Sequence, residues 1–171
     1  MAVELLKSVV ITNRDAKPSV LNDGRLERST SKAAEGYATP SATASIASIF
    51  TLISLPSTAI VQQLYLTNGA VTSAAANIGV YRPTAIDGTA GAVVSVSLFA
   101  AAVSLAVAGN NTDVTNQSTT YTVAKQDQPL WQAAGLTADP GGTLDISVTL
   151  TAAATASAAV KLLCFYVDNG S

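Results

Sequence analysis

The sequence predicts an all-β fold, a jelly-roll-like β-sandwich with one or two short helices and an extended N-terminal arm. About seven or eight short apolar stretches are separated by turn-forming residues, which is the pattern of strands in sandwiches and jelly rolls. The alanine-rich runs are broken by Thr, Ser and Val, which disfavours a helical bundle, and no solenoid repeat recurs. We therefore divide the 171 residues into an arm, residues 1–43, and one β-sandwich domain, residues 44–171.

The arm differs from the rest of the chain in its charge. Residues 1–35 carry six basic and five acidic residues, which is 11 of the 20 charges in the chain. Leu5 to Ile11 is predicted as a short strand, and turn and coil formers follow it without apolar periodicity. Such a segment is either a tail without fixed structure or an arm laid on a neighbouring subunit. In the second interpretation the partner contacts are Leu5, Val9, Ile11, Arg14, Arg25 and Arg28.

The first two thirds of the domain consist of short strands and loops. The predicted strands are Ser48–Ile53, Ile60–Leu66, Asn77–Tyr81, Val93–Leu98 and Thr119–Val123. Both faces of the first strand are largely apolar, so we expect it to be covered on both sides. Phe99 to Val107 fits helical spacing as well as a strand, and both alternatives stay open. Gly109 to Ser118 is predicted to be a polar loop.

The C-terminal quarter carries the clearest pattern. Asp127-Gln128-Pro129 indicates a helix start, with Asp127 or Gln128 as the cap and Pro129 at the first helical position, and Gly135 indicates a left-handed stop. After a turn, Thr143 to Leu150 alternates between apolar and polar residues, as a half-buried strand does. A loop then leads to a strand from Ala158 to Val167, which we expect to pair antiparallel with the one before it.

Two features of this quarter suggest contacts beyond local structure. In the last strand Lys161 is expected to face solvent, which places Leu163 and Phe165 on the same outward face. Either the short helix or a partner subunit then covers these two side chains. Trp131, the single tryptophan, is predicted to be a core anchor that holds the short helix to the sheet, and the alternative is an interface anchor.

The composition excludes several kinds of chemistry. The chain has no histidine and one cysteine, Cys164, which excludes a structural zinc site, a Ser/His/Asp triad and a Cys/His dyad. The aspartates are scattered singly among turn formers, so we expect no enzyme, no cofactor and no metal site. Charged residues make up 12% of the chain, against about 25% in ordinary soluble domains. A surface this poor in charge suggests that much of it is covered in an assembly.

A membrane span and a leader peptide are both disfavoured. Ala90 to Gly109 has no charge and about the length of a spanning helix. However, serines interrupt it, it alternates with the period of a strand, and no aromatic or basic anchor flanks it closely. Glu4 lies where a secretory signal carries basic residues. The net charge of −2 also gives no electrostatic footprint for nucleic acid.

Several short motifs follow one another along nearly the whole chain. They are Lys7-Ser8-Val9-Val10-Ile11-Thr12-Asn13 with Asp15-Ala16 and Pro18, Phe50-x-Leu52-x-x-Leu55-Pro56-Ser57, Gly79-Val80-Tyr81, Phe99-Ala100 with Ala102-Val103, Leu130-Trp131 with Gly135-Leu136, Asp139-Pro140-Gly141 and Asp145-Ile146. In this order they resemble the small decoration, or cement, proteins of tailed-bacteriophage capsids.

The resemblance implies a structural protein of the virion. It would be made in the host cytoplasm, bind the outer surface of the major capsid protein shell as a dimer or trimer, and stabilise that shell without catalytic residues. Nucleic acid, membranes and small-molecule substrates are not among the implied partners. Two other classes stay open: a phage fibre or receptor-binding β module that recognises a host surface glycan, and a holin-like membrane protein that uses Ala90 to Gly109.

Overall fold

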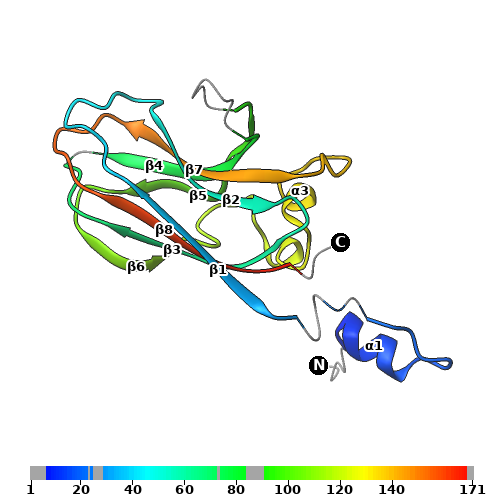
Figure 1. The fold of residues 1–171 in the computed structure, drawn as a ribbon. Coiled ribbons are helices and arrows are strands. Elements are labelled where there is room, and N and C mark those ends of the chain that lie inside the picture. Colours follow the sequence, from blue (N-terminus) through cyan, green and yellow to red (C-terminus); the bar gives the residue numbers. More distant parts are fainter. Residues whose placement is uncertain (1–6, 23, 25–28, 73, 84–90, 169–171) are drawn as a thin grey trace.

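Two antiparallel four-stranded sheets pack face to face in the computed structural model, which describes residues 7–22, 24, 29–72, 74–83 and 91–168 (Figure 1). Sheet A consists, in order, of β1 (Ser31–Ala38), β8 (Val160–Val167), β3 (Ile60–Asn68) and β6 (Gly109–Asp113). Sheet B consists of β2 (Ile49–Pro56), β7 (Thr143–Ala152), β4 (Ala75–Tyr81) and β5 (Val93–Ser104). Successive strands alternate between the sheets except at β4–β5, which is jelly-roll connectivity. The predicted all-β sandwich is confirmed.

The core lies between the two sheets. Strands β3 and β8 bury alternate apolar side chains toward strands β2, β4 and β7, as the period of a strand requires. The largest fully buried side chains on these strands are Leu55, Leu64, Leu66, Ile78, Leu144, Ile146 and Leu150. Removal of this apolar surface from water is the main contribution that holds the sheets together.

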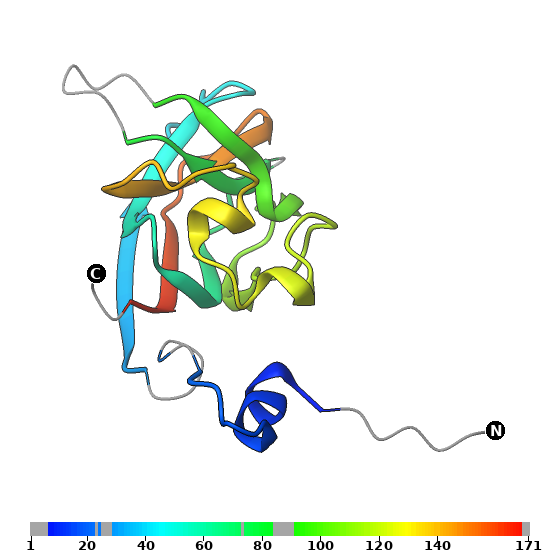
Figure 2. The same cartoon turned by 90° about the vertical axis from the view of Figure 1, so that its right-hand side faces the viewer.

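The segment between β6 and β7 closes one end of the sandwich (Figure 2, yellow). It contains a 3-10 helix, η1 (Val123–Lys125), and a short helix, α3 (Leu130–Ala133). The Tyr121 ring meets Phe99 edge-on at 5.0 Å, and its hydroxyl donates to the Val61 carbonyl at 2.9 Å. Burial raises the pKa of Tyr121 far above its ordinary value, so the phenol stays protonated as that donor.

The short helix is fastened to the β2–β3 turn through its backbone. The N–H groups of Leu130 and Trp131 donate to the carbonyls of Ala59 and Ser57, at 2.8 and 3.1 Å. Side-chain capping by Asp127 or Gln128 was expected, but no side chain caps α3, and Pro129 occupies the N-cap position. Backbone acceptors from another element therefore satisfy the free N–H groups at this helix start. The left-handed stop is confirmed at Gly135, with φ +93°.

Strand β7 is a central strand and is buried on both faces. The alternation in its sequence indicated a solvent-facing side, but Asp145, Ser147 and Thr149 are all buried. Thr149 shares a 2.6 Å hydrogen bond with the Tyr81 hydroxyl, and Ser147 donates to Thr51 Oγ1 at 3.2 Å. Short polar side chains that bond across the strands can be buried at little cost, so polarity did not indicate exposure here.

The expected pairing of the last two strands is wrong. Strand β8 lies between β1 and β3 in sheet A, whereas β7 lies between β2 and β4 in sheet B. Two strands joined by a short loop usually pair, but in a jelly roll the loop crosses from one sheet to the other. The expected loop from Ala152 to Ser157 therefore belongs to the connection between the two sheets, which runs from the end of β7 at Ala152 to the start of β8 at Val160.

Several shorter segments differ from the sequence predictions. Ser31–Ala38, which was assigned to the arm, forms β1 and pairs with β8 over its full length. Gly109–Asp113 was predicted as loop and forms β6, an edge strand. Phe99 to Ser104 continues β5, which resolves the helix-or-strand ambiguity. Thr119 to Val123 was predicted as a strand and instead forms bends that lead into η1.

The first described element is a helix rather than the expected strand. Helix α1 (Val9–Asp15) follows Ser8, whose side chain accepts from the Ile11 N–H at 3.4 Å, and Thr12 N–H donates to the Ser8 carbonyl at 2.9 Å. A local serine N-cap therefore outweighs the strand preference of the β-branched residues. In both views α1 stands clear of the sandwich, beyond the end of β1 (Figure 1, Figure 2).

Candidate partner interface

The outer face of sheet A is a mixed apolar and polar surface. Cross-strand registry places Ala33, Phe165 and Gln63 in one row, and Glu35, Leu163 and Tyr65 in the next. Tyr37, Lys161 and Thr67 form the third row. Because side chains in one row of a sheet point to the same side, these nine residues make one continuous surface. We call this surface the sheet-A face.

Leu163 and Phe165 lie on the sheet-A face, as the alternation in the last strand predicted. Both side chains are half-buried, whereas Leu162 and Cys164 point inward and are buried. Tyr65, which is not among the residues predicted as contacts, meets Phe165 edge-on with ring centroids 6.3 Å apart. Tyr65 alternates with buried residues along β3. This alternation was the sequence signal that could have placed it on the outer face as a third apolar member.

Two hollows lie on either side of Phe165. One, of about 420 Å³, is lined by Tyr65, Asn111, Leu163 and Phe165. The other, of about 390 Å³, is lined by Ser31, Gln62, Gln63 and Phe165. No residue of α3 lines either hollow, so the short helix, one of the two expected covers, does not cover Leu163 and Phe165.

Polar groups surround the apolar centre of the face. Lys161 Nζ lies 2.6 Å from Glu35 Oε2, and both side chains are well exposed. At the other edge Thr67 Oγ1 accepts from the Asn111 N–H at 3.1 Å. An apolar centre with a polar rim is the usual anatomy of a protein–protein interface, and such exposed ion pairs add little stability by themselves.

The second candidate surface is the N-terminal unit, which we define as residues 7–22. It is closed by its own hydrogen bonds: Asn13 Nδ2 donates to Asn22 Oδ1 at 2.9 Å, and the Val20 N–H donates to the Asn13 carbonyl at 3.1 Å. No residue of α1 is buried. The exposed fractions of Val9, Val20 and Leu21 are 70%, 54% and 96%. The unit thus presents apolar side chains that the described residues do not cover.

The other arm residues proposed as contacts are distributed unevenly. Ile11 is half-buried within the unit, and Arg14 is exposed with its Nε 2.9 Å from Asp15 Oδ1. Hydrogen bonds from Arg14 and then from Lys7 hold the pKa of Asp15 below its ordinary value. The remaining proposed contacts, Leu5, Arg25 and Arg28, lie outside the described residues.

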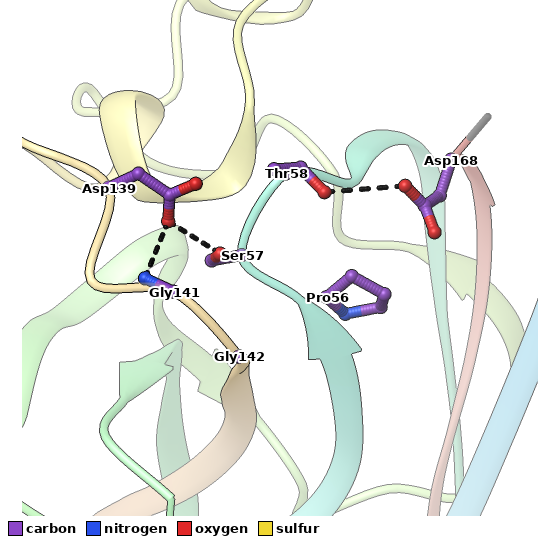
Figure 3. Close-up of a pocket in the computed structure, with 7 residues that line it drawn as sticks. All are labelled: Pro56, Ser57, Thr58, Asp139, Gly141, Gly142 and Asp168. Carbon is purple, nitrogen blue, oxygen red and sulfur yellow. Dashed lines mark hydrogen bonds between the residues drawn. The ribbon is translucent and has the colours of Figure 1, made fainter. Parts of the chain in front are cut away.

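A small polar pocket lies where the β2–β3 turn meets the segment before β7 (Figure 3). Asp139 Oδ1 accepts from Ser57 Oγ at 2.6 Å and from the Gly141 N–H at 2.9 Å, which lowers the pKa of Asp139. Asp168 lies on the other side of Pro56 and accepts from Thr58 Oγ1 at 3.3 Å. These hydrogen bonds hold the β2–β3 turn to the segment before β7 and to the residue after β8, which is a structural role.

Trp131 lies at the margin of the core. Its neighbours on α3, Leu130 and Ala133, are fully buried, whereas Trp131 is half-buried and packs against the core cluster. Leu130 is therefore expected to contribute more than Trp131 to the packing of the helix against the core. Whether Trp131 also meets a partner stays a prediction.

The described residues show neither a metal site nor a membrane-spanning helix. Among them no group of three or more His, Cys, Asp or Glu side chains is placed to hold a metal ion. No helix in the described part of the chain is both long and apolar enough to cross a bilayer. The apolar segment from Ala90 to Gly109, which had suggested a possible span, contributes β5 to sheet B.

Comparisons with known proteins reveal relatives in fold alone. No family model matches the chain, and no curated protein sequence matches it significantly. A chain in the structure titled "Cyanophage Pam1 capsid asymmetric unit" is 19% identical, with a TM-score of 0.54, over 86% of this chain and 91% of that one. A chain in "Capsid of Ralstonia phage GP4" is 14% identical, with a TM-score of 0.57, over 85% and 89%.

Proposed function

We propose that this protein is a decoration, or cement, protein that binds the outer surface of a tailed-phage capsid and stabilises the shell. The observation that carries the proposal is the fold likeness to chains from two phage capsid structures, which extends over at least 85% of both partners in each comparison. Likeness over nearly the full length indicates a protein of the same overall design rather than one shared module. The order of short motifs in the sequence supports the same family.

The surface of the protein suits an assembly role. Charged residues are few, at 12% of the chain, and the sheet-A face combines Tyr65, Leu163 and Phe165 with a polar rim. The N-terminal unit adds Val9 and Leu21, both largely exposed. Apolar surface of this kind is expected to be buried against protein partners. The proposed partners are the major capsid protein of the shell and further copies of this chain, as a dimer or trimer.

Stabilisation requires no catalytic group. A protein that binds the assembled shell, and not the separated subunits, raises the stability of the assembled state by mass action. A shell repeats the same contact many times, so a small contribution from each copy is multiplied. We place the protein on the outside of the virion, without nucleic acid, membrane or small-molecule ligands.

The direct test is binding to purified shells that lack the protein. We expect it to co-sediment with such shells and to reach a fixed number of copies per shell as its concentration rises. A glycan array probed with the same preparation tests the alternative, a receptor-binding module. Binding to host glycans without binding to shells would contradict the proposal.

A further inference from the structure

We propose that the N-terminal unit of one copy docks on the sheet-A face of a second copy, with Leu21 entering the hollow beside Leu163. This inference rests on the self-association that forms part of the proposed function, and it names the two surfaces that would meet. It assigns the exposed apolar residues of the unit and the uncovered apolar residues of the face to one contact.

The unit is built to present an apolar tip. Its fold is fixed by polar contacts within residues 7–22: Asn22 Nδ2 donates to the Val10 carbonyl at 3.3 Å, and Asn13 bonds to the Asn22 side chain. Leu21, which precedes the hydrogen-bonded Asn22, is 96% exposed. A leucine held in a defined place with almost all of its surface in water gains stability only when a partner covers it.

The sheet-A face supplies a matching site. The hollow of about 420 Å³ is lined by the apolar side chains of Tyr65, Leu163 and Phe165, with Asn111 at its edge. These residues lie on β3, β6 and β8, which are held by cross-strand pairing, so the site exists before a partner arrives. Docking on such a preformed site loses little conformational entropy on the receptor side.

Charge favours the same pairing. The N-terminal unit contains three basic residues, Lys7, Arg14 and Lys17, and one acidic residue. The described residues from 29 to 168 contain four basic and six acidic residues, so the unit carries +2 and the described sandwich −2. On the sheet-A face Glu35 is paired with Lys161, and Asp113, which lies beside Tyr65 on the neighbouring edge strand, adds one negative charge next to the face. Opposite charge on the unit and the face guides their approach and disfavours contact between two units.

The position of the unit indicates that the sheet-A face it contacts belongs to a second copy. Both views show α1 beyond the end of β1 and away from the strands that line the hollow (Figure 1, Figure 2). The unit precedes β1, which borders the sheet-A face through its pairing with β8. Two copies placed side by side can therefore exchange their units, each onto the face of the other, as a two-fold contact requires.

A disulfide trap tests the contact in the full chain. In a variant with both Leu21→Cys and Tyr65→Cys, mild oxidation should give covalent dimers whose linked peptides join positions 21 and 65. The native Cys164 does not interfere, because burial raises its pKa to about 12 and keeps it a thiol. The control pairs Tyr65→Cys with Val123→Cys, since Val123 is 80% exposed and lies on η1.

The outcomes separate the possible occupants of the face. Covalent dimers linked at positions 21 and 65, at a yield well above the control, support the proposal. A 21–65 bond formed only within single chains would show that the unit folds onto its own face and would overturn it. A yield no higher than the control would also overturn it.

A second measurement avoids engineered thiols. Sedimentation equilibrium of Leu21→Ser should show self-association weakened about ten-fold or more, whereas Val123→Ser, a control at another largely exposed residue, stays within about two-fold of the unaltered chain. Equal self-association of all three proteins overturns the contact, as does a monomer at every concentration. Binding of the same proteins to shells is measured separately, so failure of this contact is distinguishable from failure of the proposed function.

Discussion

Tyr65 and Phe165 meet edge to face across neighbouring strands of sheet A, with ring centroids 6.3 Å apart and ring planes at 82°. This is a favoured geometry for an aromatic pair. Both rings lie on the outer face of the sandwich, and Phe165 separates the two hollows there. A rigid aromatic pair of this kind on an outer face is suited to be the centre of an interface.

The first prediction concerns this pair. Phe165→Ser should lower the free energy of unfolding by only about 1–3 kcal/mol, because the ring is half-buried on the outside of the sheet. The affinity for shells, or for further copies of the chain, should fall much more than this loss of stability explains. Denaturant unfolding gives the first quantity, and co-sedimentation with sedimentation equilibrium gives the second. Normal assembly by a folded Phe165→Ser variant would contradict a role for the sheet-A face in assembly.

The second prediction concerns the attachment of α3. Leu130 is fully buried and Trp131 is half-buried, so Leu130→Ala should cost about 2–5 kcal/mol and Trp131→Ala about 3 kcal/mol or less. If the tryptophan acts only as a core anchor, its loss lowers the unfolding midpoint and leaves assembly by the folded protein unchanged. An unchanged midpoint for Trp131→Ala would contradict the core-anchor role.

The third prediction concerns pH and the Asp139 turn. Hydrogen bonds from Ser57 and then from Gly141 lower the pKa of Asp139 in the folded protein below its unfolded value. The stability that this group contributes is therefore present above the unfolded pKa and is lost as the pH falls through the folded pKa. Ser57→Ala should make the free energy of unfolding fall less steeply across that acid range. The same acid-side slope in both proteins would contradict this role of the bond.

The sequence predicted individual strands well and their neighbours poorly. The alternation in β8 placed Leu163 and Phe165 on the outer face, because one buried face imposes a period of two. The same alternation in β7 wrongly indicated a solvent-facing side, because Ser147 and Thr149 are buried and form hydrogen bonds with side chains on other strands. Such partners are distant in sequence, so a local pattern carries no information about them.

Three further features show the same limit of local patterns. The wrong pairing of β7 with β8 arose because proximity in sequence suggests a hairpin, whereas the jelly roll sends the two strands to opposite sheets. Strand β6 was not recognised because an edge strand with exposed side chains has no apolar period. Leu21 was not selected either, because a single apolar residue among coil formers has no pattern, and only its 96% exposure identifies it.

Deleting the charged residues 1–35 would not test the role of the arm by itself. Deletion of residues 1–35 would remove more than half of β1 along with the N-terminal unit, since β1 begins at Ser31. Loss of binding in that variant would mix two effects. Val9→Ser alters a side chain that is 70% exposed and lies outside the sandwich, so we expect unchanged stability together with weaker assembly. Full occupancy of shells by this folded variant would contradict a role for the arm.

The central claim is that this protein stabilises a shell, and heat release of the genome from particles measures that most directly. Particles without the protein should release their genome, or rupture, at a lower temperature than decorated particles. Adding back the purified protein should restore the higher temperature, and high salt should change this little, because the proposed contacts are mainly apolar. Identical release temperatures with and without bound protein would contradict the stabilising role.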